Sequence, residues 1–333
     1  DGADALIRAV DLLPVGLAQA CAALLDRKET CSLFATRIRA ANEPLVTVFP
    51  EGVRDDYSST VARIWSLTIA GLRDKHSAAY LCVIALSCFD PGGIPQILLT
   101  PPSMADFLVG AEPQELLVIL RNFSLIDFQG DLTTGVMRIH ALTSRAIREQ
   151  VAREEPGLFE RALLVAIHAV RDLLQEAELG SEVLRLLIAN GIRVEELVVS
   201  PGSDSFRDCA AAVELALVLA RTLRRLGDPS TARDVALRVR EVLDDGDGST
   251  GDARVHLDDS ISISLWAGGN TAEALRISGR LLDEVRGGDS RLTLLEHGAL
   301  FARTAGRTRE SVRAQKFVLK ARDRREPGSD GAV

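Results

Sequence analysis

Apolar residues recur at helical spacing along most of the chain. Between residues 59 and 72, five apolar side chains fall at offsets of 0, 3, 4, 8 and 11, namely Val61, Ile64, Trp65, Ile69 and Leu72. This spacing places them on one face of a helix that packs into a core. The same pattern predicts helices over residues 78–89, 113–123 and about 142–153.

Two short extended segments interrupt this helical pattern. Residues 125–128 and 136–140 are joined by a stretch that contains Gly130 and Gly135, which permit a chain reversal. They predict a β-hairpin, the wing of a winged helix. In the second strand Met137 and Ile139 alternate with Arg138 and His140, so the imidazole and guanidinium should point away from the apolar face.

The first 56 residues predict a small helical unit followed by a connector. Pro14 stands where a helix can begin, ahead of the good helix formers of residues 17–25. A second helix is expected over residues 32–41, with Thr30 as a candidate cap. Residues 42–56 contain two prolines and a glycine, which favours a connector.

Three glycines in the last part of the chain share a local pattern. Gly227, Gly269 and Gly306 are each followed five residues later by a small residue, and they are 42 and 37 residues apart. A glycine permits a tight turn between helices, and a small residue lets the next helix approach closely, which favours repeated helical hairpins. We interpret them as tetratricopeptide-like repeats, with an unspecified α-solenoid as the alternative.

The predicted fold is therefore mainly α, with one short β-hairpin. Residues 1–50 are expected to form a small helical subdomain, and residues 51–155 a winged-helix subdomain. Residues 156–325 are expected to form an α-solenoid of tetratricopeptide-like hairpins, and residues 326–333 a disordered tail.

Composition narrows the function classes. The net charge of −8 argues against a general nucleic-acid or anionic-membrane binder, and 47% hydrophobic residues indicate a globular protein. The absence of a long apolar run or leader predicts a cytoplasmic protein. The five cysteines lack the paired spacing of a zinc site, so we expect reduced core thiols. The scattered histidines predict no metal site.

No catalytic signature occurs in the chain. The sequence contains neither a G-x-S-x-G elbow nor a G-x-x-x-x-G-K-[ST] phosphate-binding loop, so we expect no enzyme activity and no catalytic residue in this chain. The chain begins with Asp1 and contains two methionines, so we expect it to be the carboxyl-terminal part of a larger protein.

Two segments resemble motifs of a known family. Leu12-Leu13-Pro14-Val15-Gly16-Leu17 is similar to a G-L-P-L-A motif, and Ile139-His140-Ala141-Leu142-Thr143 is similar to an M-H-D or V-H-R-L-V-Q motif. Both belong to signal-transducing ATPases of the NB-ARC or STAND type, as in apoptosome scaffolds, plant immune receptors and bacterial regulators with tetratricopeptide repeats. The resemblance covers roughly residues 5–325, with Leu12 in place of the motif's first glycine and Ala141 after the histidine.

The resemblance implies a nucleotide switch. Pro14 would pack near the adenine of ADP, and His140 would contact its β-phosphate, a charge-assisted bond of roughly 1.5–3 kcal/mol. The winged helix would relay the ADP or ATP state of an upstream NTPase domain, which would hold the nucleotide and Mg²⁺ in the intact polypeptide. No cofactor is expected within this chain itself. The repeats would bind a protein or peptide ligand, with oligomer formation on activation.

Two alternatives remain at this point. A winged-helix transcription regulator should carry a basic groove-reading helix, but residues 112–122 contain Glu112 and Glu115 and one basic residue, Arg121. Neither nucleic acid nor a membrane is therefore expected as a partner. The other alternative is a nucleotide-independent repeat scaffold in which the winged unit is a cap.

Overall fold

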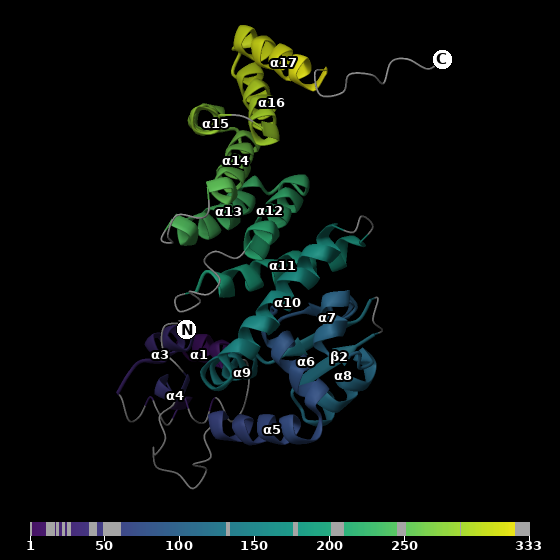
Figure 1. Cartoon of the computed structure of the whole chain (residues 1–333). Coiled ribbons are helices and arrows are strands. Elements are labelled where there is room, and N and C mark those ends of the chain that lie inside the picture. Colours follow the sequence, from purple (N-terminus) through teal and green to yellow (C-terminus); the bar gives the residue numbers. More distant parts are fainter. Residues whose placement is uncertain are drawn as a thin grey trace. The chain divides into compact units, whose positions relative to one another are not determined.

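The computed structural model describes residues 2–10, 17, 20–21, 24, 28–39, 45–48, 61–130, 134–175, 179–200, 210–244, 251–286 and 288–323. These residues are mainly helical and include one small antiparallel sheet, which confirms the predicted fold class. The chain divides into two compact units, Asp1–Leu197 and Val198–Val333. Each unit is described by itself (Figure 1).

The first unit holds the sheet and the helices around it. Its elements are α1 (Gly2–Ala9), α3 (Cys31–Arg39), α4 (Leu45–Val48), α5 (Val61–Lys75), α6 (Ser77–Ser87), β1 (Ile94–Pro95), η1 (Gln96–Leu99), α7 (Pro102–Phe107), α8 (Pro113–Asn122), β2 (Ile126–Gln129), β3 (Val136–Ile139), α9 (Ala141–Glu154), α10 (Pro156–Gln175) and α11 (Ser181–Val198).

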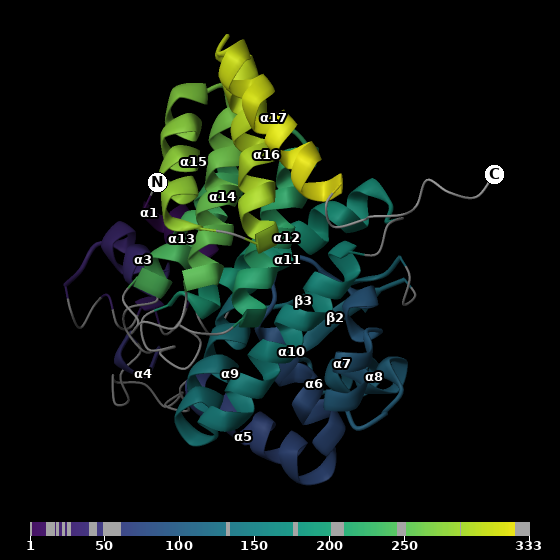
Figure 2. The ribbon, with the colours of Figure 1, turned by 45° about the horizontal axis from the view of Figure 1, so that its top comes forward.

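The second unit consists of helices joined in pairs. They are α12 (Ala210–Arg225), α13 (Pro229–Asp244), α14 (Gly251–Ala267), α15 (Thr271–Glu284), α16 (Gly288–Thr304) and α17 (Thr308–Asp323). Figure 2 shows α14, α15, α16 and α17 in a second view. Sequence-adjacent helices pack on one another throughout this unit, and α14 also contacts α12 and α16.

The predicted hairpin is present, and a third strand joins it. The strand order is β1-β3-β2, with Ile94 opposite Met137 and Asp127 opposite Arg138. The sequence did not predict β1, because two residues that include a proline carry no strand pattern. Pro95 lacks an N–H donor, so it is tolerated in an edge strand such as β1.

Helix α6 forms the centre of the first unit. Nearly all of its side chains are apolar and buried, and α5, α8, α9 and α10 pack around it. Cys82 and Cys88 lie in this core, where burial raises their thiol pKa values to about 12 and about 11. The prediction of core thiols is therefore confirmed for these two cysteines, whereas it is wrong for Cys21, which is exposed.

A buried arginine of α9 holds the carboxyl end of α6. The Ser87 carbonyl oxygen accepts hydrogen bonds from Ser144 Oγ at 2.8 Å and from Arg148 Nη1, and Arg148 Nη1 also donates to Ser144 Oγ at 2.7 Å. Desolvation lowers the pKa of Arg148 to about 9. A cation at this position is favourable because the last carbonyls of a helix carry partial negative charge.

The amino-terminal helices have a core of their own that reaches α9. Leu142, from the first turn of α9, joins a cluster whose other buried members include Phe34 and Ile38. The predicted cap of α3 is confirmed, since Thr30 Oγ1 accepts from the Leu33 amide at 3.3 Å.

One expectation about this region was wrong. The segment expected to be a connector, residues 42–56, contains helix α4, whose Leu45 and Val48 are buried in the same cluster. The Leu45 amide donates to Glu149 Oε2 at 2.7 Å, so a distant side chain of α9 satisfies a free donor at the start of α4.

The three glycines end helices as the sequence predicted. Gly227, Gly269 and Gly306 adopt φ values of +82°, +88° and +76° after α12, α14 and α16. At each turn the glycine amide donates a hydrogen bond to the carbonyl three residues before it. The amide of the next residue donates to the carbonyl five residues before that residue. This is the Schellman arrangement, which satisfies the last carbonyls of the helix.

The residue after each glycine stands at the start of the next helix. Asp228 Oδ1 accepts from the Thr231 amide at 3.0 Å, and Asn270 Oδ1 accepts from the Glu273 amide at 3.4 Å. Arg307 has this position in the third turn. The small residues expected to permit close approach are all buried, namely Ala232, Ala274 and Ser311.

Several sequence predictions stay predictions. The domain boundaries at residues 50, 155 and 325 are not tested by the described structure. Helix α10, which was assigned to the solenoid, packs against α6, α7 and α9 in the first unit. Most of residues 17–25 and all of residues 326–333 lie outside the described residues.

We expect Gly269→Ala to destabilise the second unit by about 1 kcal/mol, because an alanine is strained at φ +88°. Open space surrounds the added Cβ, so the cost is conformational. The matched control is Gly279→Ala, where a Cβ inside α15 also meets open space. There alanine should stabilise by about 0.5–1 kcal/mol. Urea unfolding followed by circular dichroism measures the free energy of unfolding of both variants. A change of the same sign in the two variants would contradict the role of Gly269 as a turn residue that needs positive φ.

Candidate interaction surface and the His140 region

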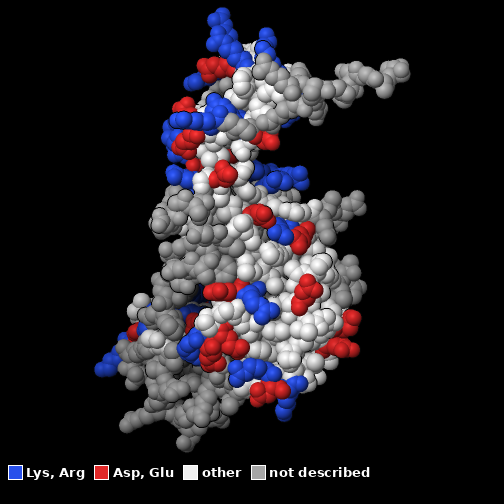
Figure 3. Space-filling model, viewed as in Figure 1, with Lys and Arg blue, Asp and Glu red and all other residues white. Residues whose placement is uncertain are grey.

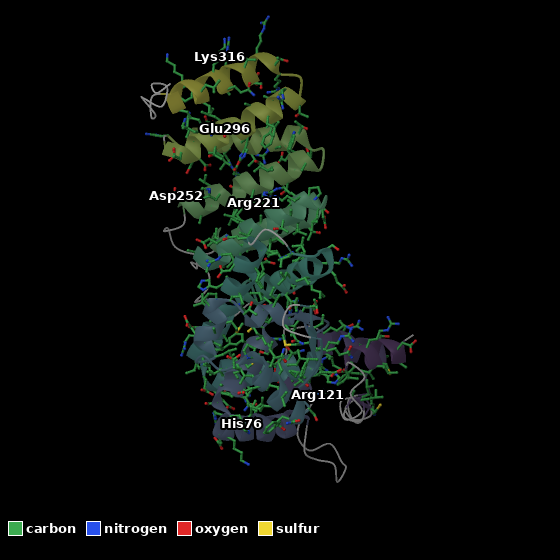
Figure 4. The ribbon with its side chains drawn as sticks, turned by 90° about the vertical axis from the view of Figure 1, so that its right-hand side faces the viewer. His76, Arg121, Arg221, Asp252, Glu296 and Lys316 are labelled. Carbon is green, nitrogen blue, oxygen red and sulfur yellow. The ribbon has the colours of Figure 1, made fainter. Side chains whose placement is uncertain are left out.

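The first helices of the three pairs, α12, α14 and α16, carry partly exposed side chains at helical spacing. On α14 these side chains lie at residues 252, 256, 259, 263 and 266, which alternate in steps of four and three. Figure 4 labels Arg221, Asp252 and Glu296, one from each helix. We call this surface the first-helix face, and it consists of Arg221, Arg224, Asp252, His256, Asp259, Ile263, Trp266, Glu296, His297, Leu300 and Thr304.

Arg224 links α12 to α14 at the edge of this face. Its Nη1 donates to Ser260 Oγ at 2.9 Å and to Ser264 Oγ at 3.0 Å. Burial lowers the pKa of Arg224, and the nearby positive charge of Arg221 lowers it further. These bonds keep a guanidinium at the boundary between the core and the face.

Two side-chain contacts link α14 to α16. His297 Nδ1 lies 2.9 Å from Asp259 Oδ2, and Trp266 Nε1 donates to Thr304 Oγ1 at 3.1 Å. The buried Phe301 ring lies between these contacts, with its centroid 5.9 Å from that of Trp266 and 6.4 Å from that of His297. The face therefore combines half-buried aromatic rings with charged groups, a composition typical of protein interfaces.

A buried carboxylate joins α14 to the second helices. Asp258 has a side chain that is 5% exposed, and its oxygens lie 2.5 Å from Arg240 Nε of α13 and 2.7 Å from Arg280 Nη2 of α15. Asp258 and Asp259 are adjacent in sequence, so they point to different sides of α14. Asp258 thus anchors a side of α14 about 100° away from the one that carries Asp259.

The alternation of buried and exposed side chains predicted for residues 136–140 is confirmed, although β3 ends at Ile139 and His140 follows it. Met137 and Ile139 are buried, whereas Arg138 and His140 are exposed. His140 is the residue before α9, and its carbonyl oxygen accepts from the Ser144 amide at 2.8 Å. Arg138 lies opposite Asp127 of β2. Pro14 lies outside the described residues, so its position relative to His140 stays a prediction.

Sequence reasoning missed the first-helix face. Its signal was present in α14, whose exposed positions follow a helical stripe, although the apolar and polar residues of that helix are otherwise mixed. Asp258 also gave a signal, because it lies among serines and apolar residues, an environment in which a carboxylate requires a partner.

Within the described ranges, no cluster of three residues suited to metal ligation occurs. The described helices also include none with the length and hydropathy that crossing a membrane requires.

No family model and no curated protein matches the chain. A crystal structure from Pyrococcus horikoshii, a signal transduction ATPase with numerous domains (STAND) and a tetratricopeptide repeat sensor, aligns with a TM-score of 0.30 and 14% identity over 92% of this chain. The alignment covers 53% of that protein, so this chain spans about half its length. A superposition of this quality does not identify a shared fold.

We expect Asp258→Asn to destabilise the second unit by about 3 kcal/mol, because two guanidiniums lose their shared carboxylate. This is the low end for a buried pair, since Arg280 is 39% exposed. The control Glu284→Gln removes the exposed partner that lies 3.7 Å from Arg280 Nε and should cost less than about 0.5 kcal/mol. Equal shifts in the urea midpoint of the two variants would contradict a special role for Asp258.

Proposed function

We propose that this chain is the ligand-binding and relay part of a regulatory protein of the NB-ARC or STAND type. The helical pairs bind a protein or peptide ligand on the first-helix face. The unit around the small sheet is a winged helix that relays the ADP or ATP state of an NTPase domain in the same polypeptide. The chain itself performs no hydrolysis in this scheme.

The observation that carries the proposal is the first-helix face. Stacked helical pairs give an extended surface to which each pair contributes side chains, which is how repeat proteins bind their ligands. Here the first helices contact one another, and their shared face presents Arg221, His256 and Trp266 to a partner. Arginine and tryptophan are the residue types that supply much of the binding energy at protein interfaces.

The order of elements supports the winged-helix assignment. Helix α6, strand β1, helices α7 and α8, and strands β2 and β3 follow one another, and β3 lies between its two partners. In a winged helix the loop between the last two strands forms the wing.

Helix α9 suits a relay because its two sides enter different cores. Leu142 lies in the amino-terminal cluster, and Arg145 Nη1 donates to the Ile38 carbonyl at 2.5 Å. On its other side Ser144 and Arg148 hold the end of α6. His140 lies immediately before this helix. A change at His140 therefore occurs next to residues of α9 that contact both cores.

The residues around His140 are compatible with an ADP phosphate. The exposed imidazole of His140, immediately after β3, can donate to phosphate oxygens. The role of Pro14 beside the adenine rests on the sequence resemblance.

The exposed charges give no support to a DNA-binding function. Glu112 and Glu115 are exposed at the start of α8, whereas the guanidinium of Arg121 lies 5.6 Å from the centroid of the Phe128 ring. A groove-reading helix is expected to present a basic surface to the phosphates.

Binding on the first-helix face is tested with a phage-displayed library of random peptides, selected on the whole chain. Peptides that bind should lose affinity about tenfold in Arg221→Ala/His256→Ala, since both side chains are exposed parts of the face. Arg276→Ala, an exposed arginine of α15, is the control and should bind as the parent does. Failure to enrich any peptide, or equal loss in the control, would remove the support for a ligand face.

The nucleotide role is tested in a polypeptide that includes the NTPase domain. We expect His140→Ala to weaken ADP retention by about tenfold or more, because a charge-assisted bond to phosphate is lost. Nucleotide content after purification is measured by ion-exchange chromatography. The control Arg138→Gln changes a nearby exposed side chain of β3, which we expect to be solvated, and should retain most of the ADP. Equal ADP content in the parent and His140→Ala proteins would favour the nucleotide-independent scaffold.

A further inference from the structure

The outward side of α17 carries a row of like charges. Arg309, Arg313, Lys316 and Lys320 follow one another at intervals of four, three and four residues, and all are exposed. At 3.6 residues per turn they fall within an arc of about 60° and extend over about 16 Å. We call these four residues the α17 basic stripe. The buried Ser311 and Val318 lie on the opposite side of the helix.

Several other arginines of the second unit have carboxylate partners. Arg233, Arg240, Arg276, Arg280 and Arg322 each form an ion pair. In the part of the chain that the structure describes, no residue of the α17 basic stripe forms one. Like charges three and four residues apart disfavour a helix. The stripe therefore weakens the helix that carries it, and an external anionic group would remove this repulsion.

Apolar side chains flank the stripe. Val312 is 41% exposed, Phe317 is 56% exposed and Leu319 is 61% exposed. Among the described residues, three of the seven large hydrophobic side chains with high exposure thus belong to this one helix. Val312 and Leu319 lie on one side of the stripe, and Phe317 lies on the other. Helix α17 packs mainly on α16, which leaves this side uncovered by a described element.

Figure 3 shows blue atoms at the end of the molecule where α17 lies, and Figure 4 shows Lys316 directed away from that helix. The whole chain carries a net charge of −8, while α17 contains five basic residues and two acidic ones, a net charge of +3. Such a local reversal of sign gives α17 a field that attracts acidic groups.

We propose that α17 is a second docking site, whose occupant is an acidic amphipathic helix of a partner protein. Acidic side chains at matching helical intervals pair with the α17 basic stripe, and apolar neighbours contact Phe317, Val312 and Leu319. This is helix recognition by complementary charge and apolar anchors. The site is separate from the first-helix face, so it does not depend on the function proposed for that face.

The exposed apolar side chains favour a protein over other polyanions. Phosphate groups of a nucleic acid would pair with the four cations but would leave Phe317 and Leu319 without a partner. A membrane-bound helix needs an apolar centre with cations at its borders, whereas α17 has cations at the centre and apolar residues at the borders.

The test uses the whole chain and a fluorescein-labelled model peptide of Glu, Leu and Ala, with Glu at intervals of four, three and four residues and Leu beside them. Fluorescence anisotropy measures its Kd at low ionic strength. The double variant Arg313→Glu/Lys316→Glu should bind about tenfold more weakly, and Phe317→Ser/Leu319→Ser should also lose affinity. The control Arg233→Glu/Arg276→Glu changes the net charge equally and should bind as the parent does.

The variants separate docking from a structural role of the stripe. Arg313→Glu places an acidic side chain four residues after Arg309, where opposite charges stabilise a helix. Circular dichroism should therefore show the same helix content in the variant as in the parent. Duplex DNA and phosphatidylserine vesicles are tested alongside the peptide. The proposal is overturned if the peptide does not bind, if its binding is unchanged by Arg313→Glu/Lys316→Glu, or if DNA or vesicles bind the stripe more tightly than the peptide does.

Discussion

The second unit depends on how the polar side chains of α14 are satisfied. This helix is surrounded by α12, α13, α15 and α16, so most of its circumference is buried. Asp258 can be buried as an anion because Arg240 and Arg280 approach it from two neighbouring helices. Arg224 satisfies Ser260 and Ser264 from a third. Together these bonds fix the rotation of α14 about its axis, and that rotation decides that Asp259, Ile263 and Trp266 contribute to the first-helix face.

The helical pairs could be predicted from sequence because their turns are made by local chemistry. A glycine with positive φ ends one helix, and the next residue already begins the following one, as Asp228 and Asn270 do by accepting an amide hydrogen bond. Arg307 has no side-chain acceptor, so the third turn depends more on Gly306 itself. Glycine spacing therefore carried the signal even though the distance between successive glycines varies.

Features that depend on distant residues could not be predicted in the same way. Strand β1 exists because Ile94 and Pro95 meet β3, and α4 is capped by Glu149 from a helix about a hundred residues later. The exposure of His140, just after β3, followed from alternation alone, whereas Pro14 falls outside the described residues. The first-helix face was not predicted because it is formed by side chains of three helices, and the sequence does not show which faces of these helices lie side by side.

Helix α9 shows why a local event near His140 can have an effect elsewhere in the first unit. Leu142, Arg145 and Glu149 lie three and four residues apart and contact the amino-terminal helices, whereas Ser144 and Arg148 contact α6. The two sets share one helix, so α9 cannot turn to favour one without disturbing the other. Arg148 and Ser144 make such a turn costly, because the buried guanidinium and the hydroxyl would both lose the Ser87 carbonyl of α6. A ligand at His140 shifts this arrangement only by as much as its affinity differs between two positions of α9. In the relay that we propose, the buried arginine thus sets the free energy that a change at His140 must supply.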